Sequence, residues 1–268
     1  MKANLSALCL AILLLLPLTS EGQNMWLGTN RIPAGQIVEF VLAPNARARM
    51  EAGKSGRKID IIKGAVAVPD GFSLLKPRPI LVVSVPSGGS PIKAMAGYTN
   101  VALGAGWVVL AGEGPRVAVE DDTVQWGWGM LSSVLDFVSR SWPQTKAWPV
   151  ACAGFSGGAK RSATVAAAMM KDGYNVVGIF MGGCNEDRAT LGLQLYQPGD
   201  RFKQVPIFLS NGTSDPIAGP QHVAPVAESM RRSGFGNIRL ETYDAGHRMS
   251  DEQLKMALQW FKQSSLQR

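Results

Sequence analysis

The chain has 268 residues, of which 46% are hydrophobic and 18% are charged, and its formal net charge is +7. This length and apolar content suffice for one large domain with a buried core, or for two small ones, and they exclude a disordered chain. No interleaved aromatic residues or nucleic-acid motif accompany the positive charge, so we interpret it as promoting solubility and expect no nucleic-acid partner.

The amino terminus has the pattern of a secretory signal over residues 1–22. The basic residue Lys2 precedes the apolar run 5–16, and small residues lead to a cleavage site after Gly22. The run is short for a transmembrane helix, which needs about 20 apolar residues. We therefore expect a signal peptide, a single domain at 23–268, a secreted or periplasmic location, and no stable membrane association after cleavage. An uncleaved membrane anchor is the alternative.

The first part of the mature chain has strand patterns. Residues 36–43 and 60–69 are rich in β-branched residues and lie between turn formers, which predicts an antiparallel pair of strands. Residues 79–85 and 106–111 are almost wholly apolar, as is typical of parallel strands buried on both faces. A solvated hairpin loop is predicted between the first two strands, with the cationic residues Arg47, Arg49, Lys54, Arg57 and Lys58.

Helical and strand patterns alternate through the rest of the chain. This alternation predicts an α/β fold, with a doubly wound, mainly parallel sheet flanked by helices. We expect residues 184–204 to form a loop-rich insertion that could cover the site. Apolar spacing predicts helices over 92–104, 123–139, 159–170, 222–232 and 251–263. Further apolar runs predict strands at 148–153, 175–181, 205–209 and 238–243.

The sequence GFSGG at 154–158 joins the predicted strand 148–153 to the predicted helix 159–170, with Ser156 at the apex. A sharp strand-to-helix turn raises a serine hydroxyl above the sheet, and flanking glycines permit the close packing that such a turn needs. The N-terminus of the helix adds free N–H groups and a positive dipole end, which suit a reaction that develops an oxyanion. The alternative is a glycine-rich turn before an ordinary helix.

Three further polar residues follow predicted strands: Ser87, Asp215 and His247. Because the carboxyl ends of parallel strands meet at the same edge of a sheet, we expect all three to lie with Ser156 at that edge. This places a hydroxyl, a carboxylate and an imidazole within reach of one another, as nucleophilic catalysis by serine requires.

Several neighbouring residues have a simpler interpretation. His222, the other histidine of the mature chain, lies on a predicted surface helix, and Asp244 is expected to cap a loop. Glu186 and Asp187 follow the preceding strand and are the alternative to Asp215 as the acid. We interpret Lys160 and Arg161 as solvated helix positions, with attraction of an acidic substrate as the alternative. Trp126 and Trp128 are interpreted as packing residues rather than as platforms for a substrate.

The two cysteines of the mature chain, Cys152 and Cys184, each lie near the end of a predicted strand. An exported location permits a disulfide between them, and two buried free thiols are the alternative. Neither is a convincing nucleophile. No metal-ligand spacing is present, so we expect no metal and no cofactor.

Together these features resemble the α/β-hydrolase family over roughly residues 60–265. The resemblance rests on GFSGG at 154–158, Asp215 in NGTSD and His247 in AGH, in the chain order Ser, Asp, His. It is closest to secreted esterases and depolymerases, which have a segment like VPDGF at 68–72 before a strand such as PILVVSV.

The resemblance implies a role for each site residue. Ser156 would be the nucleophile, His247 its general base and Asp215 the residue that orients the imidazole. The oxyanion hole would combine the N–H of Gly157 with an N–H from Ser87 or Gly88. Many relatives have a His-Gly pair after the corresponding strand, whereas this chain has Val85-Pro86-Ser87-Gly88-Gly89. Either Ser87 or Gly88 could therefore supply the second N–H donor, and the sequence does not show which residues support this loop.

The function implied is a secreted serine esterase acting on a small-molecule or polymeric ester. A serine peptidase of the prolyl-oligopeptidase type shares the triad, but we expect no room in this chain for the large accessory domain of those enzymes. A catalytically silent module with the same fold is a further alternative. Retention of the serine, the aspartate and the histidine argues against it.

Overall fold

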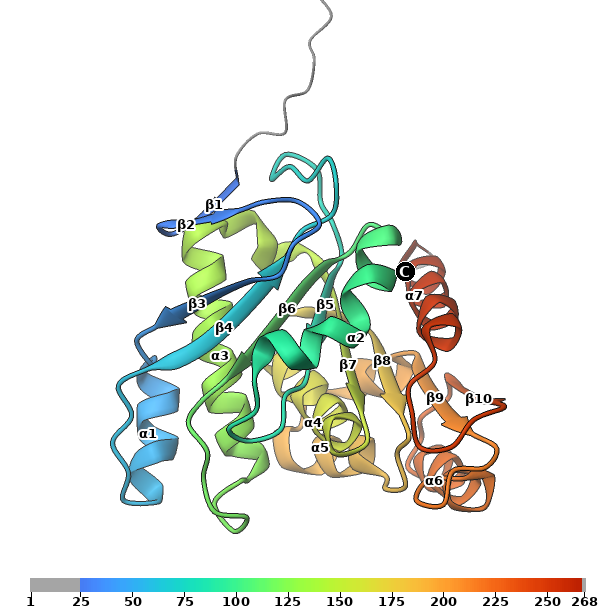
Figure 1. The fold of residues 1–268 in the computed structure, drawn as a ribbon. Helices are drawn as coiled ribbons and strands as arrows, with labels where there is room; N and C mark the ends of the chain where they lie inside the picture. The colour runs from blue at the N-terminus through green and yellow to red at the C-terminus, as the bar shows by residue number, and fades with distance from the viewer. Residues whose placement is uncertain (1–24, 267–268) are drawn as a thin grey trace, which may run out of the picture.

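A computed structural model describes residues 25–266, and the signal peptide predicted at 1–22 lies outside the described residues. An eight-stranded sheet forms the centre of the molecule (Figure 1), with the strand order β10-β9-β8-β7-β5-β6-β4-β3. Its strands are β3 (Val38–Leu42), β4 (Ile62–Ala67), β5 (Ile80–Val83), β6 (Val108–Glu113), β7 (Pro149–Phe155), β8 (Asn175–Gly182), β9 (Ile207–Gly212) and β10 (Ile238–Tyr243). A separate two-stranded sheet pairs β1 (Met25–Leu27) with β2 (Asn30–Ile32).

The sheet is mostly parallel. Strands β5 to β10 run in one direction, while β4 is antiparallel to both of its neighbours, β3 and β6. Strand β5 lies between β6 and β7. The strand that follows β5 in the chain, β6, is therefore on one side of it, and the next strand, β7, is on the other side. In open α/β sheets this reversal of strand order creates a crevice at the carboxyl ends of the strands. The segments after β5 and β7 therefore meet at this crevice.

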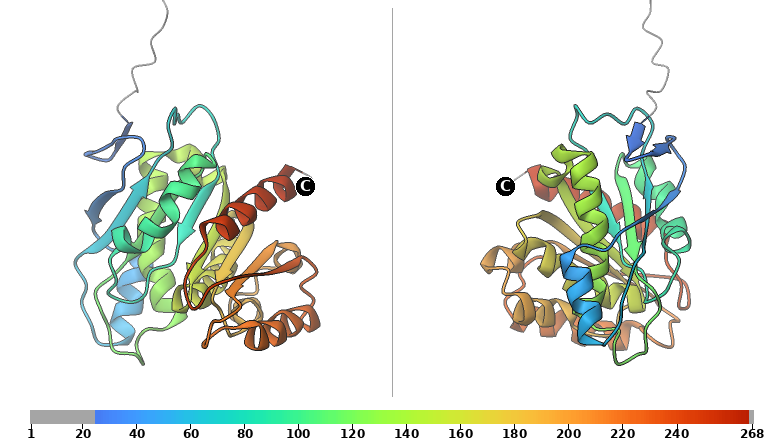
Figure 2. Two further views of the ribbon diagram at one scale, coloured as in Figure 1. Left: turned by 45° about the vertical axis from the view of Figure 1, so that its right-hand side comes forward. Right: turned by 90° about the vertical axis from the view of Figure 1, so that its left-hand side faces the viewer.

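Helices cover both faces of the sheet (Figure 2). One face packs against α2 (Pro91–Gly104) and α7 (Asp251–Leu266). The other face packs against α3 (Val124–Ser141), α4 (Gly157–Lys171) and α6 (Pro220–Arg232). On the same side, α1 (Ala46–Lys54) packs on α3 and α5 (Arg188–Tyr196) packs on α4. Two short 3-10 helices, η1 (Pro143–Ala147) and η2 (Asp200–Gln204), precede β7 and β9. No helix within residues 25–266 is long and apolar enough to cross a membrane.

The core lies on the two faces of the sheet, and the continuous apolar runs predicted as strands are its central layer. All four residues of β5 are buried, as expected for a strand covered on both faces. Trp126 and Trp128 of α3 are buried on one face, which confirms their interpretation as packing residues. Cys152 and Cys184 are both buried free thiols.

The predicted hairpin loop after β3 is wrong, because residues 46–54 form helix α1. The side chain of Asn45 caps the helix by accepting a hydrogen bond from the N–H of Ala48 at 2.8 Å. Ala48 and Ala52 face the core. Arg47 pairs with Asp172 just beyond the end of α4. The buried residues of this helix are two alanines and Glu51, so the helix lacks the large apolar residues that reveal an amphipathic pattern.

The predicted loop-rich insertion at 184–204 also contains a helix, α5. It packs along α4, and the contact is close at Gly192, where an added Cβ would lie 2.9 Å from the Cβ of Ala167. Asp187 caps this helix by accepting a hydrogen bond from the N–H of Thr190 at 2.9 Å. The segment therefore covers the side of α4.

Candidate active site

The turn after β7 has the strained geometry that the GFSGG sequence predicts. Strand β7 ends at Phe155, helix α4 begins at Gly157, and Ser156 between them has φ 54° and ψ −120°. A positive φ is uncommon for a residue with a side chain and is held only where its surroundings enforce it. The N–H of Ser156 donates to the carbonyl of Gly182 at 2.8 Å, which ties this residue to the end of β8.

Asp215 and His247 form a hydrogen-bonded pair. Nδ1 of His247 lies 2.7 Å from Oδ2 of Asp215, whose side chain is 1% exposed. The other carboxylate oxygen accepts hydrogen bonds from the N–H groups of Ile217 at 2.8 Å and Ala218 at 2.9 Å. Burial raises the pKa of Asp215, but the hydrogen bonds from Ala218, His247 and Ile217 outweigh burial and lower the pKa overall.

This pairing fixes the tautomer of the imidazole. A carboxylate with a lowered pKa is ionised at neutral pH and can only accept hydrogen bonds, so Nδ1 of His247 must carry the proton that lies between the two groups. In the neutral ring, Nε2 then has a free lone pair. The pair therefore presents a base that is oriented by a buried carboxylate.

The imidazole reaches across the sheet toward the turn that carries Ser156. Its ring centroid lies 4.8 Å from that of Phe155, the residue before the serine. A Cβ built on Gly183 would lie 3.1 Å from Cε1 of His247, so the ring passes directly over the end of β8. Since Ser156 bonds to Gly182, the serine and the histidine both lie against the end of this strand.

The segment after β5 forms a tight turn beside Ser156. Strands β5 and β7 are neighbours, and the N–H of Ser84 donates to the carbonyl of Ala153 at 2.8 Å. The turn closes through a hydrogen bond from the N–H of Gly89 to the carbonyl of Pro86 at 2.8 Å, with φ +66° at Gly88. Ser87 and Gly88 therefore lie at the predicted edge.

The two charged residues after the turn, Lys160 and Arg161, both form ion pairs. Arg161 is wrongly predicted as solvated, because its side chain is only 13% exposed and is paired with Glu113 and Asp122. Lys160 pairs with Glu186, which also pairs with Arg188. These cations line a polar cavity of about 180 Å³ that also contacts Gly157.

The alternative acids are otherwise engaged. Glu186 forms ion pairs with Lys160 and Arg188. Asp187 caps α5 and accepts a hydrogen bond from the hydroxyl of Ser229 at 2.7 Å. Asp244 and His222 are exposed. Within residues 25–266, no three His, Cys, Asp or Glu side chains gather in a way that could hold a metal ion.

No family model matches this sequence, and no curated protein matches it. Solved structures do. An α/β serine hydrolase without a lid from Xanthomonas campestris is 20% identical, with a TM-score of 0.54 over 87% of this chain and 97% of the other. A cold-adapted esterase from an Arctic intertidal metagenomic library is 16% identical, with a TM-score of 0.58 over 85% of this chain and 94% of the other.

A larger protein also matches. A Bacteroides ovatus protein described as a dipeptidyl aminopeptidase IV is 14% identical, with a TM-score of 0.57 over 85% of this chain. This chain spans only 36% of that protein. At these identities the likeness of all three structures concerns the fold.

Proposed function

Since this chain has the α/β-hydrolase fold, we propose that it is a serine hydrolase that cleaves carboxylic esters through an acyl-enzyme on Ser156. One observation carries the proposal: an imidazole oriented by a buried carboxylate packs against Phe155, the residue before a strained serine. The strain at Ser156 supports it further, because strained backbone conformations cluster at active sites.

In the proposed first half-reaction, Nε2 of His247 takes the proton of the Ser156 hydroxyl. At the same time, Oγ of Ser156 attacks the carbonyl carbon of the ester. The carbonyl oxygen becomes an oxyanion, which the N–H of Gly157 and an N–H from Ser87 or Gly88 would stabilise. His247 then gives the proton to the departing alcohol as the bond to it breaks. Asp215 stabilises the imidazolium throughout.

In the second half-reaction, water replaces the serine. His247 takes a proton from water, the hydroxide adds to the acyl carbon, and collapse of the intermediate releases the acid and returns the proton to Ser156. Apart from water, the proposed steps use only the side chains and backbone N–H groups already described. We propose a secreted or periplasmic enzyme, consistent with the signal predicted at 1–22.

A fluorophosphonate probe and a short p-nitrophenyl ester test this function. We expect the purified protein to be labelled at Ser156 and to release p-nitrophenol, and we expect Ser156→Ala to abolish both. The matched control is Ser162→Ala, since Ser162 lies on the same helix, is buried and bonds only to backbone carbonyls. Absence of labelling in the wild-type protein would favour the catalytically silent module.

A peptidase is the second candidate, and the match to the Bacteroides ovatus protein favours it. The same side chains would then transfer an acyl group from a peptide nitrogen. Faster hydrolysis of a peptide p-nitroanilide than of the p-nitrophenyl ester, both dependent on Ser156, would support this candidate over the esterase.

A further inference from the structure

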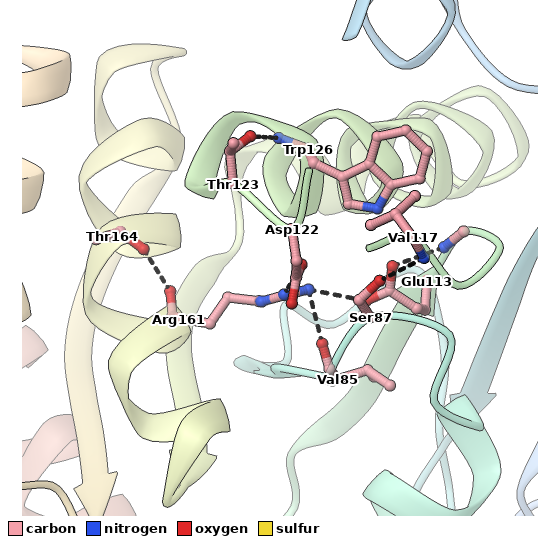
Figure 3. Close-up of polar contacts among 10 residues, drawn as sticks. Val85, Ser87, Glu113, Val117, Asp122, Thr123, Trp126, Arg161 and Thr164 are labelled. Atoms are coloured by element: carbon pink, nitrogen blue, oxygen red, sulfur yellow. Dashed lines mark hydrogen bonds and ion pairs between the residues drawn. The ribbon is translucent and has the colours of Figure 1, made fainter. Parts of the chain in front are cut away.

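Arg161 connects parts of the chain that lie far apart in sequence. Its Nη1 atom donates to the carbonyl of Val85 at 2.9 Å and to Oε2 of Glu113 at 2.9 Å. Its Nη2 atom contacts Oδ1 of Asp122. Figure 3 shows the guanidinium in the middle of these three acceptors. Since the side chain is 13% exposed and Glu113 is 2% exposed, this is a largely buried cluster.

Each acceptor belongs to a different element around the site. Val85 directly precedes the turn 86–89, Glu113 is the last residue of β6, and Asp122 lies two residues before α3 begins. Arg161 itself lies on α4, four residues after Gly157. One side chain therefore links the helix that begins after Ser156 to the turn after β5.

The segment between Glu113 and Asp122 packs onto the same turn. A Cβ built on Gly88 would lie 2.3 Å from the Cβ of Arg116, so the segment lies directly against this residue. The N–H of Val117 donates to Oγ of Ser87 at 3.3 Å, a contact that Figure 3 includes. Because Arg161 binds Glu113 and Asp122 at the two ends of the segment, it holds the segment over the turn as well as holding the turn itself.

We propose that Arg161 is a positioning residue that fixes the turn 86–89 relative to the N–H of Gly157. This inference rests on the proposed function, in which those two backbone sites share one oxyanion. An oxyanion hole works only when its donors are preorganised around the position of the developing charge. Arg161 is a direct link between the two sides, since its backbone belongs to α4 and its side chain binds Val85.

Arginine suits this position and lysine does not. A guanidinium offers five N–H donors in a planar fork, whereas an ammonium is a compact charge on a flexible stem. Burial raises the pKa of Glu113 to about 8, despite the opposing effects of the Arg161 charge and the Gly114 N–H. Loss of the cation would raise this pKa further. Arg161→Lys avoids that change, because it keeps a positive charge while losing some of the three bonds.

Hydrogen exchange tests the positioning without reference to activity. In Arg161→Lys we expect roughly tenfold faster exchange in the peptides 84–90 and 114–118, which contain the bonded N–H groups of Gly89 and Val117. Exchange in α4 should match the wild type. Unchanged exchange in both peptides, or an equal increase across the chain, would overturn the proposal.

Steady-state kinetics with the p-nitrophenyl ester test the consequence. We expect kcat of Arg161→Lys to fall about 10-fold to 100-fold, with KM within about twofold of the wild type. The control is Arg47→Met, which removes an ion pair with Asp172 at the opposite end of α4. Equal losses in the two variants, or a loss confined to KM, would overturn the positioning role.

The two proposals fail in different ways. If the wild-type protein shows no hydrolysis that depends on Ser156, the proposed function is wrong, and hydrogen exchange alone decides whether Arg161 holds the turn. If the wild-type protein hydrolyses the ester and Arg161→Lys retains its kcat, only the inference about Arg161 is wrong.

Discussion

Gly154 of β7 and Gly158 of α4 approach so closely that a Cβ built on Gly154 would lie 2.1 Å from the carbonyl carbon and oxygen of Gly158. The strand and the helix that follow one another across Ser156 therefore pack backbone against backbone. This contact requires glycine, since no side chain can fit between the two segments. The close approach sets how sharply the chain turns at the serine.

The first prediction concerns this contact. We expect Gly154→Ala to lower the free energy of unfolding by about 1–3 kcal/mol, the usual cost of forcing extra volume into a packed site. Gly157→Ala is the matched control, because a Cβ there would meet no atom within 4 Å. Urea denaturation of both variants gives the comparison. Equal stability of Gly154→Ala and Gly157→Ala would show that the turn can relax.

Much of the fold could be predicted from the sequence because parallel strands buried on both faces have continuous apolar runs. The runs at 79–85, 175–181 and 205–209 correspond to β5, β8 and β9. Once these strands are assigned, their shared direction brings the residues that follow them to one edge. The positions of Asp215 and His247 could be predicted for this reason.

The remaining elements could not be predicted, for physical reasons that differ between them. Helices α1 and α5 bury mainly Ala and Gly, which give little apolar periodicity. Arg161 has the pattern of a solvated helix residue, and its partners Val85, Glu113 and Asp122 lie 76, 48 and 39 residues away in sequence. Only the folded chain shows that these acceptors surround a single guanidinium.

The second prediction concerns the tautomer of His247. In Asp215→Asn, the amide oxygen can keep the bonds from Ile217 and Ala218, which directs the NH₂ group at Nδ1. Nδ1 must then accept a hydrogen bond, so the proton moves to Nε2, and the ring can no longer act as the base of the proposed mechanism. We expect kcat for the ester to fall about 10³-fold to 10⁴-fold, with KM little changed. A loss below tenfold would contradict the role of this pair.

The third prediction concerns the stability of the protein in acid. The folded state lowers the pKa of Asp215 below its ordinary value of 3.8, so the carboxylate stabilises the fold above that pH. This contribution is lost as the pH falls through the lowered pKa. We expect the wild type to be more stable than Asp215→Asn at pH 7, and the difference to shrink below about pH 4. Urea denaturation across this range measures it, and a constant difference would contradict the assignment.

The fourth prediction concerns the buried pair of Arg161 and Glu113. Arg161→Met leaves the Glu113 carboxyl group, which is 2% exposed, without its guanidinium donor. We expect the free energy of unfolding to fall by about 1–3 kcal/mol, the usual cost of an unsatisfied buried polar group. The double variant with Glu113→Gln should recover part of this loss, because a glutamine amide stays neutral and brings its own NH₂ donors to the cluster. A double-mutant cycle in urea measures the coupling between the two residues. Additive losses would show that the pair does not interact.

The fifth prediction separates backbone strain from crowding of the imidazole. Gly183 has φ +56°, and a Cβ on it would lie 2.9 Å from the ring of Phe155 and 3.1 Å from Cε1 of His247. Gly173 has φ +85°, and a Cβ on it would meet no atom within 4 Å, so Gly173→Ala carries a similar backbone cost without crowding. We expect both variants to lose stability, but only Gly183→Ala to lose kcat by about tenfold or more. In the proposed mechanism, a displaced imidazole can no longer take the proton of the Ser156 hydroxyl. Equal kcat values in the two variants would contradict a catalytic role for His247 in the position observed beside Gly183.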